Sequence, residues 1–454
     1  GGERVLWVAL AALEASALAP NLHVKVYTGD DATSEAILQR AKDRFNVDLL
    51  SARRMHLSFE RIVSRSLLGA IASAGKAPTG KPQHPPTPAE ASMYPRFTML
   101  GQSLGSMAVA VECLLRFCPD VLLDTTGFAF TYPIARLAGC TVATYTHYPT
   151  ITKDMLQRVH EARPTYNNDA TISNSSTLTA VKLLYYRAFA AVYALAGACA
   201  DVIMVNSSWT KGHIDELWRY PGSLGDVESS GAHVVFPPCN TEGFRDAELD
   251  PQGRAARRMV VSVAQFRPEK DHRLQLEALA ALRRMGSEFS DVKLHLIGGC
   301  RNAEDEAFVA GLRQRAQQLG LEDAVEFRLN VPFAELQAAL AQGTLGLHTM
   351  WNEHFGIGVV EMMASGLITI AHNSGGPRAD IVVPAAPADD AVGFLASTPQ
   401  EYADSMAAVL RDAVDVPRMA TAARRRTEEF TDERFSAEFL RHFTPALELA
   451  AQAV

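Results

Sequence analysis

Two glutamates bracket a glycine-containing turn in the second half of the chain. In the segment WNEHFGIGVVE, Glu353 and Glu361 flank Gly356 and Gly358. A strand-like run precedes the turn and a helix-like run follows it, so amides at the helix start would attract an anion. Glycines let a phosphate or a sugar approach the backbone. We therefore expect Glu361 to accept ribose hydroxyls and Glu353 to contact a sugar, although a solvated loop glutamate and a helix-capping glutamate fit the spacing equally well.

Two cations follow an earlier strand-like run of the same half. The segment SVAQFRPEKDH places Arg267 and Lys270 after that strand and just before a helix. A guanidinium and an ammonium together suit a diphosphate. An ordinary charged turn explains the segment as well, but its expected proximity to the Glu353 loop favours the diphosphate.

Three further segments place histidine or glycine at strand ends or helix starts. In TYTHYPT, His147 follows a first-half strand and would orient a sugar hydroxyl or stabilise a developing charge. The SGGP segment at 374–377 follows a second-half strand, and Gly1 and Gly2 precede a helix as a phosphate-facing loop would. A structural histidine and plain turns also account for these segments.

Strand-like and helix-like runs alternate along both halves. In the first half we predict strands at 23–28, 120–124, 140–146 and 201–205, and helices at 5–18, 32–45 and 107–117. In the second half we predict strands at 259–263, 292–297, 324–329, 344–348, 367–371 and 393–396, and helices at 272–284, 304–319, 333–341, 358–365 and 399–412. Such alternation predicts an α/β protein with two Rossmann-like, doubly wound domains. They are expected to face each other across a cleft that holds the ligands.

The domain boundary is expected in the polar, turn-rich stretch 237–254. We assign residues 1–245 to the N-terminal domain and 246–430 to the C-terminal domain, and we expect a terminal amphipathic helix at 431–454. The Pro-, Ala- and Gly-rich stretch at 70–95 is predicted to be a surface insertion.

Composition excludes some classes of function. The 43 Lys and Arg against 51 Asp and Glu give a net charge of −8, which offers no basic surplus for nucleic acid. The six cysteines are scattered without zinc spacing and suit a reducing compartment. The apolar run at 5–18 is interrupted by Glu14 and is too short to span a bilayer. The stretch 178–200, with Lys182 and Arg187 as its charges, fits a buried helix or one at a membrane interface.

With these motifs in place, the chain resembles the retaining GT-B glycosyltransferases of family four, the glycogen-synthase-like group. Longer blocks are similar to the eukaryotic dolichol-pathway α-1,2-mannosyltransferases. These blocks are GGERVLW, YPRFTMLGQSLGSM, THYPTITKDML, VNSSWTKGHI, VVFPPCNTEGF, FRPEKDH, EHFGIGVVEMMASG and AHNSGGP. The resemblance runs from residue 1 to about residue 382 and omits the insertion. It implies a membrane anchor and a first strand before Gly1.

The resemblance implies an activity and a location. Enzymes of that family add the fourth and fifth mannoses to the lipid-linked oligosaccharide on the cytosolic face of the endoplasmic reticulum. The N-terminal domain would then face acceptor and membrane, and the C-terminal domain would bind the nucleotide sugar.

The resemblance also implies a role for each donor-site residue. Arg267 and Lys270 would hold the GDP diphosphate, together with the amides of Phe355, Gly356 and Ile357. No metal and no cofactor are expected, because these groups would replace the metal at the diphosphate.

The remaining roles concern the sugar and the reaction. Glu361 would bind the ribose, Glu353 the mannose hydroxyls, and His147 the mannose, with Glu353 and His147 as the catalytic residues. Gly2 would face the β-phosphate. Retention of the anomeric configuration is expected, by front-face attack in which the departing phosphate helps deprotonate the acceptor.

The expected partners are GDP-mannose, a dolichol-linked oligosaccharide, a membrane surface and a complex with other early mannosyltransferases, with no nucleic acid. Two alternatives remain open. One is another family-four hexosyltransferase using a UDP-sugar, because nothing in the motifs reads the base. The other is a catalytically dead GT-B scaffold, which loss of the glycine loop would favour and intact Glu353, Arg267 and Lys270 argue against.

Overall fold

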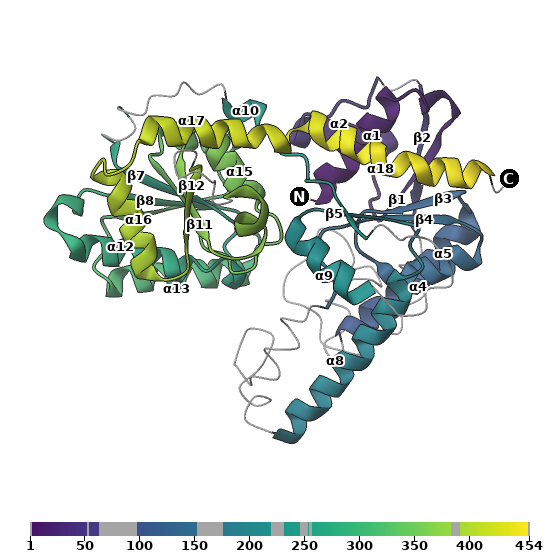
Figure 1. The fold of residues 1–454 in the computed structure, drawn as a ribbon, viewed down its shortest axis with the longest axis horizontal. Helices are drawn as coiled ribbons and strands as arrows, with labels where there is room; N and C mark the ends of the chain where they lie inside the picture. Colours follow the sequence, from purple (N-terminus) through teal and green to yellow (C-terminus); the bar gives the residue numbers. More distant parts are fainter. Residues whose placement is uncertain are drawn as a thin grey trace. The chain divides into compact units, whose positions relative to one another are not determined.

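The computed structural model describes residues 2–51, 54–62, 98–151, 176–218, 231–245, 253, 257–382 and 391–452. Contacts divide the chain into two compact units (Figure 1). Unit 1 comprises Gly1–Asn206, Thr210–Val235 and Phe435–Val454, and unit 2 comprises Ser207–Trp209 and Phe236–Arg434. The main division therefore falls at residues 235–236, just before the polar stretch in which the sequence predicts it. The insertion predicted at 70–95 lies outside the described residues.

Unit 1 is built on two small parallel sheets. One pairs β1 (His23–Thr28) with β2 (His56–Arg61), and the other has the order β3 (Val121–Asp124), β4 (Thr141–Thr146), β5 (Val202–Val205) and β6 (His233–Val234). The four predicted strands are confirmed within a residue of their ends, whereas β2 and β6 were not predicted. All six residues of β4 are buried, as expected for a parallel strand covered on both faces.

The helices of unit 1 complete its cores. They are α1 (Gly2–Ala15), α2 (Ser34–Phe45), α4 (Thr98–Arg116), α5 (Tyr132–Leu137), α8 (Ser176–Gly197), α9 (Ser208–Trp218) and α18 (Asp432–Gln452). The predicted terminal helix is confirmed and extends to Gln452 as α18. Its rings of Phe435, Phe439 and Phe443 recur every four residues, stack on one another, and join Trp7 of α1 in one core. The end of the chain thus contributes to the core of its beginning.

Unit 2 contains one six-stranded parallel sheet in the order β12-β11-β10-β7-β8-β9. The strands are β7 (Met259–Val263), β8 (Lys293–Gly298), β9 (Val325–Leu329), β10 (Leu345–His348), β11 (Ile368–His372) and β12 (Gly393–Ala396). Numbered from the first strand of the unit, this order is 6-5-4-1-2-3, which is the Rossmann arrangement. The strand order reverses between β7 and β10, so a ligand is expected at the carboxyl ends of these two strands.

The helices of unit 2 match five predictions and add two, α10 and α17. They are α10 (Glu242–Arg245), α12 (His272–Met285), α13 (Ala303–Gln318), α14 (Phe333–Gln342), α15 (Ile357–Ala364), α16 (Pro399–Leu410) and α17 (Val416–Arg426). The largest core of the unit lies between the sheet, α12 and α16, with fully buried Leu276, Leu294 and Tyr402. This rigid base supports the loops at the strand ends.

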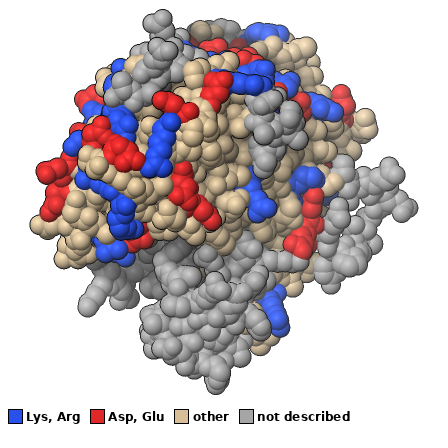
Figure 2. Space-filling model, turned by 60° about the vertical axis from the view of Figure 1, so that its left-hand side comes forward, with Lys and Arg blue, Asp and Glu red and all other residues tan. Residues whose placement is uncertain are grey.

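Charges of both signs mix on the face shown in Figure 2, where Lys and Arg lie interspersed with Asp and Glu. Several arginines of unit 2 pair with carboxylates, including Arg315 with Glu277 and Arg411 with Glu288. This face therefore carries no field of a single sign.

A buried carboxylate fixes the loop after β3 in unit 1. Asp124, 8% exposed, accepts hydrogen bonds from the amides of Thr126 (2.8 Å), Gly127 (3.1 Å) and Phe128 (2.8 Å). The Tyr132 hydroxyl donates to the same carboxylate at 2.7 Å. One side chain thus satisfies several buried donors, which would be left unpaired without it.

We expect Asp124→Ala to lower the free energy of unfolding of unit 1 by about 3 kcal/mol, because three backbone amides and a buried hydroxyl lose their acceptor. Urea denaturation followed by circular dichroism measures the change. Exposed Asp120 lies at the other end of the same strand, and Asp120→Ala is the control. Equal effects of the two substitutions would contradict the assigned role of Asp124.

Candidate active site

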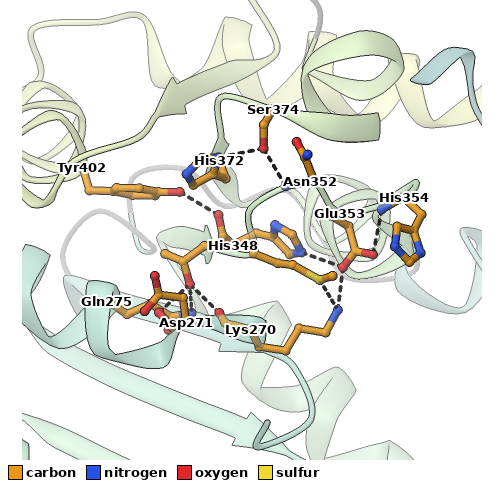
Figure 3. A network of polar contacts seen from close by, with 12 residues as sticks. Lys270, Asp271, Gln275, His348, Asn352, Glu353, His354, His372, Ser374 and Tyr402 are labelled. Carbon is orange, nitrogen blue, oxygen red and sulfur yellow. Dashed lines mark hydrogen bonds and ion pairs between the residues drawn. The ribbon is translucent and has the colours of Figure 1, made fainter. Parts of the chain in front are cut away.

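The candidate site lies where the strand order of unit 2 reverses. The loop after β7 carries Arg267 and Lys270, and the loop after β10 carries Glu353. Thr349 joins these loops, because its hydroxyl lies 2.8 Å from the Lys270 carbonyl oxygen and accepts a hydrogen bond from the Gln275 amide at 2.8 Å. The two predicted motifs, about 80 residues apart in sequence, therefore form one site, as Figure 3 shows.

The Glu353 carboxylate is the centre of this site (Figure 3). Its Oε2 lies 2.5 Å from Lys270 Nζ and 3.2 Å from His348 Nε2, and its Oε1 accepts the His354 amide at 3.1 Å. Lys270 Nζ also lies 3.1 Å from the Met350 sulfur. The Glu353 and Lys270 side chains are only 15% and 22% exposed. Both charged groups are thus held in fixed positions at the strand ends.

Glu353 remains ionised far into the acid range. Burial by itself raises the pKa of this carboxyl, but the hydrogen bond from His348 and the charge of Lys270 outweigh burial. The pKa of Glu353 therefore lies well below its usual range. Such a carboxylate is a weak base, suited to accepting hydrogen bonds and stabilising positive charge rather than to taking up a proton.

The helix after the loop starts directly against strand β7. Gly356, the residue before α15, has φ +114°, a conformation that other residues rarely adopt. A Cβ added to Gly358 would lie 3.3 Å from the Val263 carbonyl oxygen, so the first turn of α15 approaches the end of β7 closely. The buried Phe355 ring packs on Phe430. The amides of residues 355–357 are thus held at the helix start, where an anion is favoured.

Half-buried Glu361 stands one turn into α15. Arg267 differs from Lys270 in its surroundings: its guanidinium is 39% exposed and pairs with Glu269 at 3.4 Å. The structure therefore brings Lys270 and Glu353 into direct contact and leaves Arg267 on the more exposed side of the β7 loop.

The SGGP segment supports the Glu353 loop. A Cβ on Gly375, whose φ is +61°, would lie 2.3 Å from the Glu353 carbonyl oxygen, and one on Gly376 would lie 2.5 Å from Phe355 Cα. The Gly376 amide donates to that Glu353 carbonyl at 2.7 Å, and Ser374 Oγ accepts the Asn352 amide at 2.8 Å. The glycines of this segment therefore permit contact between two backbones, which the sequence alone did not distinguish from a plain turn.

Residues 207–209, which are distant in sequence, also contact the loop that carries Glu353. The Ser207 hydroxyl donates to the His354 carbonyl at 2.6 Å, and the Trp209 ring stacks on the His354 ring with centroids 5.8 Å apart. The Ser208 amide donates to the buried Asp380 carboxylate at 2.8 Å. These residues belong to the VNSSWTKGHI block, to which the sequence analysis assigned no role.

The other predicted site residues lie in unit 1. His147 follows β4, and its Nε2 would lie 3.1 Å from a Cβ added to Gly2 at the start of α1. The Tyr145 ring contacts the His147 ring edge-on at 5.0 Å. Gly2 and His147 therefore meet, as expected if both contact one ligand.

Sequence reasoning missed the residues that position the carboxylate. His348 is the last residue of β10 and is almost fully buried, and Thr349 follows it. The predicted strand 344–348 includes His348 and ends before Thr349, and the sequence predicts no site role for either residue. One signal could have identified them: His348 stands five residues before Glu353, and Thr349 four, at the end of a predicted strand.

Two Rossmann-like units in one chain are the architecture of the GT-B class of glycosyltransferases. Solved structures agree on the fold: Anabaena Alr3699/HepE in complex with UDP has a TM-score of 0.58 at 15% identity, covering 93% of this chain and all of that chain. A Rickettsia africae glycosyltransferase has a TM-score of 0.55 at 12% identity, covering 94% of this chain and 99% of that chain.

Sequence comparisons identify the family. Residues 1–70 and 87–218 match the family model for the ALG11 mannosyltransferase N-terminus, and 246–426 match glycosyl transferases group 1. The interruption at 71–86 falls inside the predicted insertion. The human GDP-Man:Man(3)GlcNAc(2)-PP-Dol alpha-1,2-mannosyltransferase is 43% identical over 97% of this chain and 83% of its own length. The Dictyostelium discoideum enzyme of the same name is 38% identical over 98% and 82%. The chain belongs to this family of mannosyltransferases.

We expect Gly375→Ala to lower the free energy of unfolding of unit 2 by about 1–3 kcal/mol, because the added methyl group meets the Glu353 carbonyl and the backbone has positive φ. Guanidinium denaturation measures the change. Gly311 of α13 is the matched control, since a Cβ there meets nothing within 4 Å. Gly311→Ala should stabilise the unit by up to about 1 kcal/mol, and a loss similar to that of Gly375→Ala would contradict the packing argument.

Proposed function

We propose that the protein transfers mannose from GDP-mannose to a dolichol-diphosphate-linked oligosaccharide, forming α-1,2 linkages with retention of configuration. The observation that carries this proposal is 43% identity to the human GDP-Man:Man(3)GlcNAc(2)-PP-Dol alpha-1,2-mannosyltransferase across almost the whole chain. The intact pair of Lys270 and Glu353 supports catalysis rather than a scaffolding role.

The donor binds at the switch point of unit 2 in this proposal. Lys270, Arg267 and the helix-start amides of 355–357 hold the diphosphate, since these groups bring positive charge to the ends of β7 and β10. Glu361 accepts the ribose hydroxyls. Glu353 accepts the mannose hydroxyls while it remains paired with Lys270, so one ion pair links the sugar to the diphosphate.

The chemistry follows from these charges. The bond between mannose C1 and the β-phosphate oxygen breaks, and the electron pair leaves with GDP. The acceptor hydroxyl attacks C1 from the same face and passes its proton to the departing phosphate. Glu353 stabilises the positive charge that develops on the sugar, because a carboxylate with so low a pKa stays ionised and is a poor proton acceptor.

We further propose that transfer needs no metal ion and no cofactor. Lys270, Arg267 and the start of α15 supply the charge that stabilises the leaving diphosphate. Activity should therefore persist in excess EDTA, and its loss, with recovery on adding Mg²⁺ or Mn²⁺, would contradict this point.

The decisive assay combines radiolabelled GDP-mannose with a trimannosyl lipid-linked acceptor and sizes the glycan. We expect two added mannoses. Glu353→Gln should lower kcat by about 10²–10³-fold through lost charge stabilisation. Lys270→Ala should weaken GDP binding by about tenfold or more in calorimetry.

Glu335→Gln on the exposed face of α14 is the control and should leave kcat unchanged. Turnover with UDP-glucose and none with GDP-mannose would support the alternative UDP-sugar hexosyltransferase. Absence of turnover with every donor would support the alternative of an inactive scaffold.

We also propose that unit 1 docks on the cytosolic face of the endoplasmic reticulum membrane. Exposed aliphatic side chains recur on one face of α4 (Leu100, Leu104, Val111, Leu115) and of α8 (Leu184, Val192, Leu195). Leu137 of α5, a helix that packs against both, is 90% exposed. Residues 178–200 contain Lys182 and Arg187 and no acidic residue, which suits an anionic lipid surface.

Among the helices of the described residues, none is both long and apolar enough to cross a bilayer. A complex with other early mannosyltransferases stays a prediction.

Leu104→Glu and Leu184→Glu should each weaken binding to phosphatidylcholine–phosphatidylserine vesicles by about tenfold, because each removes a leucine from the lipid and adds a like charge. Vesicle co-sedimentation measures the change. Leu449→Glu on α18, at a leucine 48% exposed, is the matched control. Unchanged sedimentation together with loss of a dimer in light scattering would contradict membrane docking and assign the leucines to a contact between copies.

A further inference from the structure

A pocket of about 520 Å³ opens in unit 1 at the carboxyl ends of β1 and β2. Strand residues Thr28 and Phe59 line it together with α1 and α2. Its volume falls in the range of small-molecule sites, and its place at the ends of parallel strands is where open α/β sheets bind ligands. None of the roles assigned above uses this pocket.

The apolar part of the pocket is aromatic. The rings of Trp7 and Phe59 lie with centroids 6.4 Å apart, and both residues line the pocket. Phe59 is half-buried, so part of its ring remains accessible. Aromatic rings beside polar groups are suited to sugars, whose C–H faces pack on a ring while their hydroxyls reach polar neighbours.

The polar part of the pocket includes two ion pairs at its solvent-exposed rim. Arg40 pairs with Asp30 at 2.6 Å, and Arg44 pairs with Glu3 at 2.9 Å. Asp43 accepts a hydrogen bond from Gln39 at 2.7 Å. Three carboxylates against two guanidinium groups leave the lining with one net negative charge, which disfavours a phosphate or diphosphate. Hydrogen-bond donors and acceptors side by side suit the hydroxyls of an uncharged sugar.

The pocket adjoins the other predicted site of unit 1. Glu3 and Trp7 of α1 line the pocket, and Gly2, the residue before Glu3, contacts His147. A ligand in the pocket would therefore lie next to the end of α1 at which His147 stands. This proximity connects the pocket to the transferred sugar, if His147 contacts mannose as proposed.

We propose that this pocket binds a hexose unit of the acceptor oligosaccharide next to the end of α1 at which His147 stands. The inference rests on the proposed mannosyl transfer. Phe59 packs on the C–H face of the sugar, and Asp30 and Arg40 bind its hydroxyls. The pocket contributes affinity for the acceptor and takes no part in the chemical step.

The test measures KM for the acceptor and for GDP-mannose separately, on the whole chain. Asp30→Ala, Arg40→Ala and Phe59→Leu should each raise the acceptor KM by about tenfold, as expected for one lost hydrogen bond or ring contact. The KM for GDP-mannose should not change. Arg61→Ala is the matched control, because Arg61 pairs with Asp31 on the neighbouring strand end, and neither lines the pocket.

Two acceptors distinguish the part of the ligand that is bound. The increase in KM should be the same for a free trimannosyl chitobiose oligosaccharide and for its lipid-linked form. An increase confined to the lipid-linked form would assign the pocket to lipid and overturn the proposal. So would a raised KM for GDP-mannose, or acceptor KM values equal to wild type. If wild type itself adds no mannose, the proposed function has failed instead, and loss of free-oligosaccharide binding in the same variants by NMR titration still tests the pocket.

Discussion

The ion pair between Lys270 and Glu353 joins the ends of β7 and β10, and much of unit 2 serves to hold it. Two buried charges are costly unless each is paired and hydrogen-bonded. His348 and the His354 amide complete the bonding of the carboxylate, and Thr349 fixes one loop to the other. The pair can therefore remain ionised and in place before any donor arrives. Preorganised charge of this kind is the main means by which a protein stabilises charge that develops during a reaction.

Two segments distant in sequence contact the loop that carries Glu353. Gly375 and Gly376 pack on its backbone, the Ser207 hydroxyl donates to the His354 carbonyl, and the Trp209 ring stacks on the His354 ring. Because the contacts of Gly375, Gly376 and Ser207 involve backbone atoms of the loop, they fix its path and not only the direction of one side chain. The precision of the site thus depends on residues that need not touch a substrate.

Much of this arrangement could be predicted from sequence, and the rest has a physical explanation. Apolar runs gave the strands of unit 2 to within about a residue, and the strand order placed Lys270 beside Glu353. The local pattern of apolar residues does not indicate which residues distant in sequence form hydrogen bonds with each other. The bond from Ser207 to His354 spans 147 residues and could not be predicted in this way. In sequence, His348 looks like one more residue of a buried strand. Only the structure shows that its ring also contacts Glu353.

Two elements of other kinds were also not predicted. Strand β6 has two residues, and the buried residues of α17 are three alanines and one methionine, so neither gives an extended run of large apolar residues. The caps of α17 were readable, because Asp415 accepts the Arg418 amide and Pro417 occupies the first turn. Capping residues can therefore indicate a helix where the apolar pattern is too short to do so.

The path of the chain through the two units has a consequence for how they form. The chain passes from one unit to the other four times, at residues 206–207, 209–210, 235–236 and 434–435. Neither unit is therefore one continuous stretch of sequence. Unit 1 cannot complete its core until α18 has been synthesised, because Phe435, Phe439 and Phe443 supply part of it. A ribosome must make nearly the whole chain before the first unit is finished, and a fragment that ends before α18 would expose the apolar surface these rings cover.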